Sequence, residues 1–269
     1  MTHARAHAKI NLALVVGPVR PEGRHELVTV LERMELHDLL SIEPASATSV
    51  EGFPDDTIVR SALEALARAA DVSHGWAATI EKRIPVAAGL GGGSADAAAA
   101  LELANATLES PLAAERLHAL AAELGADVPF FLRRGTQLAT GDGTELEPLA
   151  LPQDYVVVLV LPHGASKGST GSVYDAFDRR DGSSGFASRA ARVHEIIRSA
   201  RSVRDLAALP PNDLASSPLS DGLRELGAFR ADVSGAGPTV YGLFDERETA
   251  VRAEQSLRSQ GRTFVTSPV

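Results

Sequence analysis

The sequence contains no cysteine, and it is poor in lysine, in aromatic residues and in long apolar runs. Without cysteine there is no disulfide, thiolate zinc site, iron–sulfur cluster or thiol nucleophile. No apolar stretch reaches the ~18–20 residues that a membrane-spanning helix needs. Acidic residues outnumber basic ones by 35 to 26, so no basic stripe serves a nucleic acid or a membrane surface. These absences argue against thiol chemistry and against a general nucleic-acid or membrane-surface binder.

What is present is ordinary for a globular protein: 269 residues, 44% hydrophobic and 23% charged. This length allows one large domain or two ordinary ones of ~100–200 residues each. Only three of the 26 basic residues are lysines, namely Lys9, Lys82 and Lys167. Codon bias toward arginine accounts for the ratio, but an ammonium and a guanidinium are not interchangeable, so each retained lysine is of interest.

The hydrophobic pattern predicts a mixed α+β protein with two domains, 1–150 and 151–269. The N-terminus imitates a signal peptide only weakly, because its apolar part is short and no cleavage site follows; we expect a cytoplasmic protein. Segment 178–188 is expected to be a mobile loop. The expected strands are 10–16, 27–34, 39–43, 76–80, 138–140, 145–149, 155–161, 230–233, 239–244 and 263–266. The expected helices are 57–70, 94–108, 111–124, 193–200, 203–208, 222–226 and 246–259.

The most informative segment is a glycine-rich loop, residues 85–95, between a strand and an alanine-rich helix. Glycines let successive N–H groups converge on one anion, and Ser94 is placed to cap the helix whose N-terminus adds further donors. Neither the Walker A pattern nor the dinucleotide fingerprint is present, and a tight packing turn is the alternative. We predict nucleotide phosphate binding by Lys82, Pro85, Val86, Ala87, Ala88, Gly89, Leu90, Gly91, Gly92, Gly93, Ser94 and Ala95.

Three ordered motifs carry a family resemblance. Residues 85–98 resemble the second motif of the galactokinase, homoserine kinase, mevalonate kinase and phosphomevalonate kinase superfamily. Ala-Lys-Ile-Asn-Leu at 8–12 resembles its N-terminal motif, and Val-Ser-Gly-Ala-Gly-Pro-Thr at 233–239 resembles its C-terminal glycine motif. Residues 23–27 and 124–129 are similar to one branch, whose members phosphorylate a cytidine-diphosphate sugar alcohol in non-mevalonate isoprenoid biosynthesis. The likeness covers nearly the whole chain and is weakest over 178–209.

The resemblance implies a two-domain α+β fold with its active site in the interdomain cleft, and transfer of the γ-phosphate of ATP to a tertiary hydroxyl. It implies that Asp127 is the catalytic carboxylate; from position alone a helix N-cap is the alternative. It also implies that Lys9 is the active-site lysine, against the alternative of a solvated surface charge. Asn11 lies on the same strand face as Lys9 and is expected to bind the substrate.

The resemblance further implies a cytosine site. His25 matches a residue that reads the base, and Tyr174 matches an aromatic residue that stacks on it, although each also suits a structural role. The family usually has Tyr where this chain has Arg24, and we hypothesise that the Arg24 guanidinium stacks on the base instead. The remaining expected substrate-binding residues are Thr170, Gly235 and Gly237.

ATP use implies Mg²⁺, for which the sequence names no certain protein ligand; Ser94 is the residue to test. Two alternatives to the cytidine-diphosphate substrate stay open: a superfamily kinase for a different small alcohol, and a catalytically silent nucleotide-binding homologue. The combined presence of Lys9, Ser94 and Asp127 argues against the silent homologue.

Overall fold

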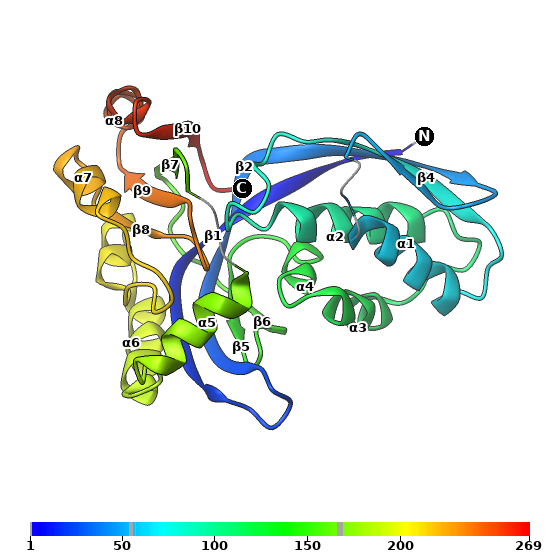
Figure 1. Cartoon of the computed structure of the whole chain (residues 1–269), viewed down its shortest axis with the longest axis horizontal. Helices are drawn as coiled ribbons and strands as arrows, with labels where there is room; N and C mark the ends of the chain where they lie inside the picture. The colour runs from blue at the N-terminus through cyan, green and yellow to red at the C-terminus, as the bar shows by residue number, and fades with distance from the viewer. Residues whose placement is uncertain (1, 54–55, 57, 166–168) are drawn as a thin grey trace. The chain divides into compact units, whose positions relative to one another are not determined.

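The computed structural model describes residues 2–53, 56, 58–165 and 169–269. Helices and strands are interspersed along the described chain (Figure 1). The strands are β1 (Thr2–Val19), β2 (His25–Ala45), β3 (Ser49–Glu51), β4 (Gly75–Glu81), β5 (Gln137–Thr140), β6 (Glu145–Pro148), β7 (Val156–Pro162), β8 (Arg230–Val233), β9 (Val240–Phe244) and β10 (Gly261–Thr266). The helices are α1 (Ile58–Ala69), α2 (Gly92–Asn105), α3 (Ala114–Leu124), α4 (Val128–Phe131), α5 (Thr170–Arg179), α6 (Phe186–Ser199), the 3₁₀ helix η1 (Val203–Ala208), α7 (Leu219–Glu225) and α8 (Arg247–Leu257).

The chain forms two compact units that do not follow the expected single boundary near residue 150. Unit 1 consists of Met1–Ala8, Leu36–Val86 and Gly91–Arg134, and unit 2 of Lys9–Glu35, Ala87–Leu90 and Gly135–Val269. The reason lies in β1 and β2, which have 18 and 21 residues and contribute to both units. Ordinary strands have about 3–10 residues. The expected break between 34 and 39 is absent, because β2 continues through it.

In unit 1, β4 pairs antiparallel with the second half of β2, and β3 pairs parallel with β4. Helices α1 and α2 pack together and against β4, and α3 and α4 pack on these two helices (Figure 1). The apolar stripe of α1 is buried at Val59, Leu63 and Leu66. Helix α2 is buried from Ala95 to Leu101. Its alanine side chains are small, so neighbouring elements pack closely against it on several sides.

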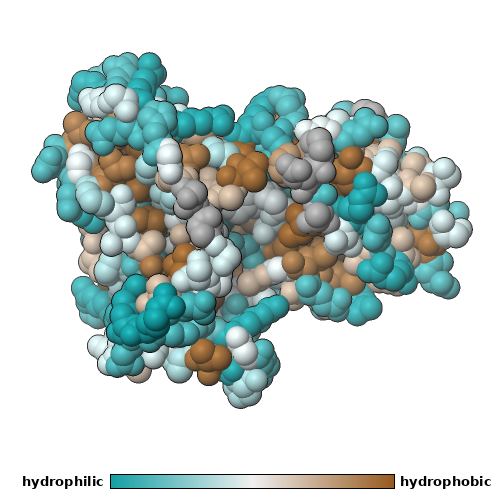
Figure 2. All heavy atoms as spheres, in the orientation of Figure 1, coloured by the Kyte–Doolittle hydropathy of each residue, from teal (hydrophilic) through white to brown (hydrophobic). Residues whose placement is uncertain are grey.

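In unit 2, the first half of β2 pairs with β5 and β5 with β6, while a second sheet has the order β10-β7-β9-β8. Helix α8 packs on β7 and β10, and α7 packs on β8 and β9. Apolar side chains of these elements, including Val158, Leu223, Val240 and Phe244, form one core. The outer surface of α8 is hydrophilic (Figure 2), as expected for a helix that covers one face of a sheet.

Most expected elements are present in the structure. Two of them begin well before their expected first residues 10 and 193, because β1 begins at Thr2 and α6 at Phe186. Three short elements were not expected, namely β3, α4 and α5. The expected mobile loop 178–188 is wrong at both ends, because α5 extends to Arg179 and α6 begins at Phe186. Residue 57, where the first helix was expected to begin, lies outside the described residues.

Among the described helices, none is both long and apolar enough to cross a membrane.

Unit 2 buries a carboxyl group, that of Glu32 on β2, which is completely shielded from solvent. Its oxygens accept hydrogen bonds from Thr136 Oγ1 (2.9 Å), Gln153 Nε2 (2.9 Å) and Tyr155 Oη (3.2 Å). Burial raises the pKa of Glu32 to about 7, in spite of these three donors. Between pH 4.5 and 7 the carboxyl group of Glu32 therefore stays protonated in the folded protein, whereas in the unfolded chain it has lost its proton. The free energy of unfolding falls as pH rises through this window.

We expect Glu32→Gln to remove this pH dependence. Between pH 5 and pH 8, the free energy of unfolding of the variant should gain about 2 kcal/mol relative to wild type. Urea unfolding at several pH values measures the difference, with Glu248→Gln on the exposed face of α8 as the control for loss of a charge. Parallel curves for Glu32→Gln and wild type would contradict the prediction.

Candidate functional site

A buried lysine lies at the centre of the first cluster of predicted site residues. Lys9 is only 3% exposed, so the alternative of a solvated surface charge is wrong. Its Nζ donates a hydrogen bond to Asn11 Oδ1 at 2.6 Å, consistent with period-two placement on one face of β1. Asn11 Nδ2 in turn donates to Thr29 Oγ1 (2.9 Å), which donates to the carbonyl of Ala13 (2.7 Å). This chain fixes the orientation of the Asn11 amide and with it the ammonium position.

The C-terminal glycine motif lies directly against this pair. A Cβ added to Gly235 would lie 3.4 Å from both Lys9 Nζ and Asn11 Oδ1, and the φ of Gly235 is +58°. A side chain there would be strained and would crowd the ammonium. The structure thus brings together Lys9, Asn11 and Gly235, which come from two motifs more than 220 positions apart in the sequence.

The first part of the glycine-rich loop packs on the same turn. A Cβ at Gly89, whose φ is +80°, would lie 2.5 Å from the carbonyl oxygen of Ser234 and 2.7 Å from that of Gly237. Ser234 Oγ donates to the Gly89 carbonyl at 3.0 Å, and Thr239 N donates to the Ala88 carbonyl at 3.2 Å. Gly89 is therefore needed for close packing, the alternative that the sequence left open for this loop. The same contacts hold the turn that contains Gly235 beside Lys9.

The second part of the loop forms the N-terminus of α2. This helix begins at Gly92, with Gly91 at the N-cap in the left-handed region at φ 70°. The expectation that Ser94 caps the helix is wrong, because Ser94 is the third helical residue. In the described chain no side chain caps this end, and its first turn presents N–H groups beside small residues, Gly92 and Gly93. Such a terminus has the donors and the dipole that suit a phosphate group.

Lys82, predicted to bind phosphate, lies between two buried carboxylates in unit 1. Its Nζ is 2.5 Å from Asp38 Oδ2 and 2.7 Å from Asp96 Oδ2. Asp38 Oδ1 also accepts hydrogen bonds from the backbone N–H groups of Arg83 (2.5 Å) and Ile84 (2.8 Å). The carboxylates thus connect β2, the 82–84 turn and the first turns of α2. A Cβ at Gly92 would lie 3.3 Å from Lys82 Nζ, so the ammonium also reaches the start of α2.

Burial raises the pKa of Asp96 to about 7, a rise that Lys82 opposes and Asp38 reinforces. Asp96 is 1% exposed, and its Oδ1 has no hydrogen-bond partner among the described residues. Burial lowers the pKa of Lys82, but the two carboxylates outweigh it, so that the net direction is upward. The lysine therefore stays charged, and much of its charge is compensated within the cluster.

Asp127 belongs to unit 1 and stands at the N-cap position of α4, directly before the buried residues Val128 and Pro129. Its backbone is in the right-handed helical region, at φ −83° and ψ −17°. Among the described residues, its side chain forms no capping hydrogen bond with this helix. Asp127 thus occupies the N-cap position, but its carboxylate does not cap the helix. The role of Asp127 as the catalytic carboxylate stays a prediction.

The two residues expected to bind cytosine lie side by side in unit 2. The rings of His25 and Tyr174 stack, with centroids 4.9 Å apart and planes 27° apart. His25 Nδ1 is 2.8 Å from the Gly17 carbonyl oxygen, and His25 Nε2 is 3.4 Å from Asp178 Oδ2. The Phe177 and His25 rings meet edge to face, with centroids 5.8 Å apart. Helix α5, which was not expected, carries these partners and brings Tyr174 to the start of β2.

Arg24 forms an ion pair with Asp142, whose Oδ2 lies 2.7 Å from Arg24 Nη1. The arginine side chain is half exposed, so the pair contributes little to stability. It leaves the stacking hypothesis untested. Thr170, the other expected contact, is the first residue of α5 and is exposed.

Several neighbours of these side chains were missed from the sequence, namely Thr29, Asp38, Asp96, Phe177 and Asp178. A carboxylate inside an apolar strand, as in Leu36–Leu40, is a usable signal of a buried charge partner for Asp38. The others carry no such signal, because long-range packing alone brings them to the site. Among the described residues, no group of three or more His, Cys, Asp or Glu side chains could hold a metal ion.

Comparisons with known proteins agree with this geometry. Residues 57–135 match the family "GHMP kinases N terminal domain", and residues 216–263 match "GHMP kinases C terminal". The chain is 34% identical to the 4-diphosphocytidyl-2-C-methyl-D-erythritol kinase of Chlorobium chlorochromatii, over 98% of this chain and 95% of that protein. It is 39% identical to the protein of the same name from Pelotomaculum thermopropionicum, over 98% and 96%.

The chain belongs to the 4-diphosphocytidyl-2-C-methyl-D-erythritol kinase family. A crystal structure of 4-(cytidine 5'-diphospho)-2C-methyl-D-erythritol kinase is 31% identical, covers 99% of both chains and has a TM-score of 0.81. A mevalonate kinase structure has a TM-score of 0.77 at 12% identity, which shows the shared fold alone. The family and fold expected from the three motifs are thus confirmed for this kinase chain.

Proposed function

We propose that the protein transfers the γ-phosphoryl group of ATP to the 2-hydroxyl of 4-diphosphocytidyl-2-C-methyl-D-erythritol, a step of non-mevalonate isoprenoid precursor biosynthesis. The observation that supports this most is the buried Lys9–Asn11 pair against the Gly235 turn. A cation fixed in a dry site stabilises the negative charge that develops on a reacting alcohol oxygen. The likeness to kinases of this name over nearly the whole chain supports the same conclusion. ATP consumption fits the cytoplasmic location expected from the sequence.

In this mechanism Lys9 attracts the acceptor oxygen, and the Asn11 amide orients the hydroxyl group. Asp127 accepts the hydroxyl proton as the oxygen–phosphorus bond forms, and ADP leaves. The N–H groups at the start of α2 bind ATP phosphates, with the Ser94 hydroxyl as the first candidate contact for accompanying Mg²⁺. The metal ion would neutralise phosphate charge.

The stacked His25–Tyr174 pair supports binding of the cytosine end of the substrate. His25 and Thr29, which contacts Asn11, are four residues apart on β2, about 13 Å along the strand. Two sites at that spacing in one unit suit the ends of an extended nucleoside diphosphate ester. The pair has a polar edge as well as two ring faces, so it can both stack on a base and hydrogen-bond it.

The decisive experiment measures ADP release with ATP, Mg²⁺ and the cytidine-diphosphate sugar alcohol. Turnover with this acceptor, with phosphate located on the 2-hydroxyl by ³¹P NMR, is the expected result. Turnover with another small alcohol alone would replace the proposed acceptor. ATP binding without turnover on any acceptor would indicate a silent homologue.

The Arg24 hypothesis gives a separate prediction. If its guanidinium stacks on the cytosine, Arg24→Ala should raise the KM for the cytidine substrate about 2–5-fold and leave the KM for ATP unchanged, as expected for one exposed cation–π contact. Asp142→Ala, which removes the ion-pair partner and keeps the guanidinium, is the matched control. An unchanged cytidine KM in Arg24→Ala would overturn the stacking hypothesis.

A further inference from the structure

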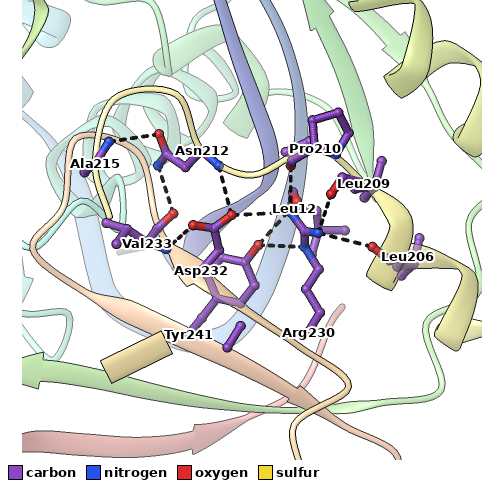
Figure 3. Close-up of polar contacts among 12 residues, drawn as sticks. Leu12, Leu206, Leu209, Pro210, Asn212, Ala215, Arg230, Asp232, Val233 and Tyr241 are labelled. Carbon is purple, nitrogen blue, oxygen red and sulfur yellow. Dashed lines mark hydrogen bonds and ion pairs between the residues drawn. The ribbon is translucent and has the colours of Figure 1, made fainter. Parts of the chain in front are cut away.

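A buried polar network in unit 2 lies next to the Lys9 centre, and the proposed mechanism does not use it. At one end of the network, the guanidinium of Arg230 donates to the carbonyls of Leu209 (2.7 Å) and Pro210 (2.9 Å). It also donates to Tyr241 Oη (3.2 Å) and faces Asp232 Oδ2 at 3.4 Å. Figure 3 shows these contacts fanning out from Arg230 toward the segment that leads to Asn212. The arginine thus holds the backbone directly before Asn212 in place.

Asn212, which is 8% exposed, joins this segment to the C-terminal glycine motif. Its Nδ2 donates to the carbonyls of Val233 (2.9 Å) and Gly235 (2.6 Å), and its Oδ1 accepts from Leu214 N (2.8 Å). Its backbone N–H donates to Asp232 Oδ2 at 2.9 Å. Figure 3 shows the amide between the loop and the strand that carries Val233. Only a primary amide offers two donors and an acceptor at this point.

The next residue, Asp213, holds the strand on which Lys9 lies. Asp213 Oδ2 accepts from Val16 N at 2.8 Å and from Arg189 Nε at 3.1 Å. Its backbone N–H donates to the Leu14 carbonyl at 2.9 Å. Tyr241 Oη, at the other end of the network, donates to the Leu12 carbonyl (3.3 Å). Two adjacent residues therefore hold the two sides of the Lys9 centre, Asn212 the glycine turn and Asp213 the strand β1.

We propose that Asn212 is a positioning residue for phosphoryl transfer, which sets the place of the Gly235 turn against Lys9 and Asn11. This inference rests on the proposed function of Lys9. Asn212 acts through the turn, because its amide donors are both bound by backbone carbonyls. Displacement of the turn by a fraction of an ångström changes the packing around the ammonium. Such a displacement affects the reacting geometry more than the binding of either substrate.

The test is a double-mutant cycle with Asn212→Ala and Lys9→Met. In the wild-type background, Asn212→Ala should lower kcat about 10–100-fold and change either KM by less than about threefold. In the Lys9→Met background, the same substitution should lower the residual kcat by less than about twofold, because the group through which it acts is gone. Equal effects of Asn212→Ala in both backgrounds would overturn the proposal.

Two further measurements separate positioning from loss of folding. Thr136→Val removes a buried hydrogen bond elsewhere in unit 2 and should lower stability without lowering kcat. The same cycle, followed by urea unfolding, should show Asn212 and Lys9 coupled by about fivefold or more in the unfolding equilibrium constant. If wild type fails to turn over the cytidine substrate, the proposed function fails, and this unfolding cycle still decides whether Asn212 and Lys9 are coupled. Independent effects on unfolding would overturn the inference.

Discussion

Asp127→Asn is expected to lower kcat about 10²–10⁴-fold while ATP still binds. An alcohol is a poor nucleophile at neutral pH, and the carboxylate is the group that we propose accepts its proton. Asparagine has the same shape and is equally suited to the start of a helix. The backbone of α4 should therefore be kept, and only the proton acceptor is lost.

This prediction is measured by steady-state kinetics and by ATP titration of the same preparation. The matched control is Glu123→Gln, which removes an exposed carboxylate from the last turn of α3, four residues before Asp127. The control should keep wild-type kcat. Wild-type kcat in Asp127→Asn would remove the carboxylate from the mechanism, and loss of ATP binding would point to a role in ground-state binding instead.

Lys82→Met is expected to lower the free energy of unfolding by about 3 kcal/mol at pH 8, because it leaves two buried carboxylates without their shared cation. Asp38 is fully buried and Asp96 is 1% exposed. Methionine fills a similar volume, so that the loss reports charge and not a cavity. Backbone N–H groups still donate to Asp38 in the variant. Most of the lost stability therefore comes from the uncompensated charge of Asp96.

Two readouts identify the cause of this loss. The double variant Lys82→Met with Asp96→Asn should recover part of the lost stability at pH 8, because one uncompensated charge is removed. Lowering the pH to 6 should also recover part in Lys82→Met alone, since the pKa of Asp96 is already about 7 with the lysine present and rises further without it. A stability change below about 0.5 kcal/mol, typical of surface substitutions, would contradict the buried cluster.

The sequence alone was enough for the family and for most elements, and it named candidate residues whose roles stay predictions. Local signals carry these features: period-two runs mark strands, alanine and leucine spacing marks helices, and glycine clusters mark turns that side chains would block. Gly89 and Gly235 illustrate the last point, because a Cβ at either would meet backbone or the ammonium. The same signals gave a wrong prediction where two neighbouring residues both suit one position. Ser94 is a good N-cap residue by type, but Gly91 takes that position in the left-handed region.

Tertiary structure alone decided the partners and environment of each candidate. The stacking of Tyr174 on His25 depends on α5, whose polar sequence gave no clear helical signal. The carboxylates around Lys82 come from positions 38 and 96, and the contact of Asn212 with the Gly235 turn joins residues 23 positions apart. Such contacts depend on how distant segments pack, which no local pattern encodes. Lysine scarcity marks Lys9 and Lys82 in the sequence, but only the folded contacts distinguish them: Lys9 bonds to a neutral amide, whereas Lys82 lies between two carboxylates.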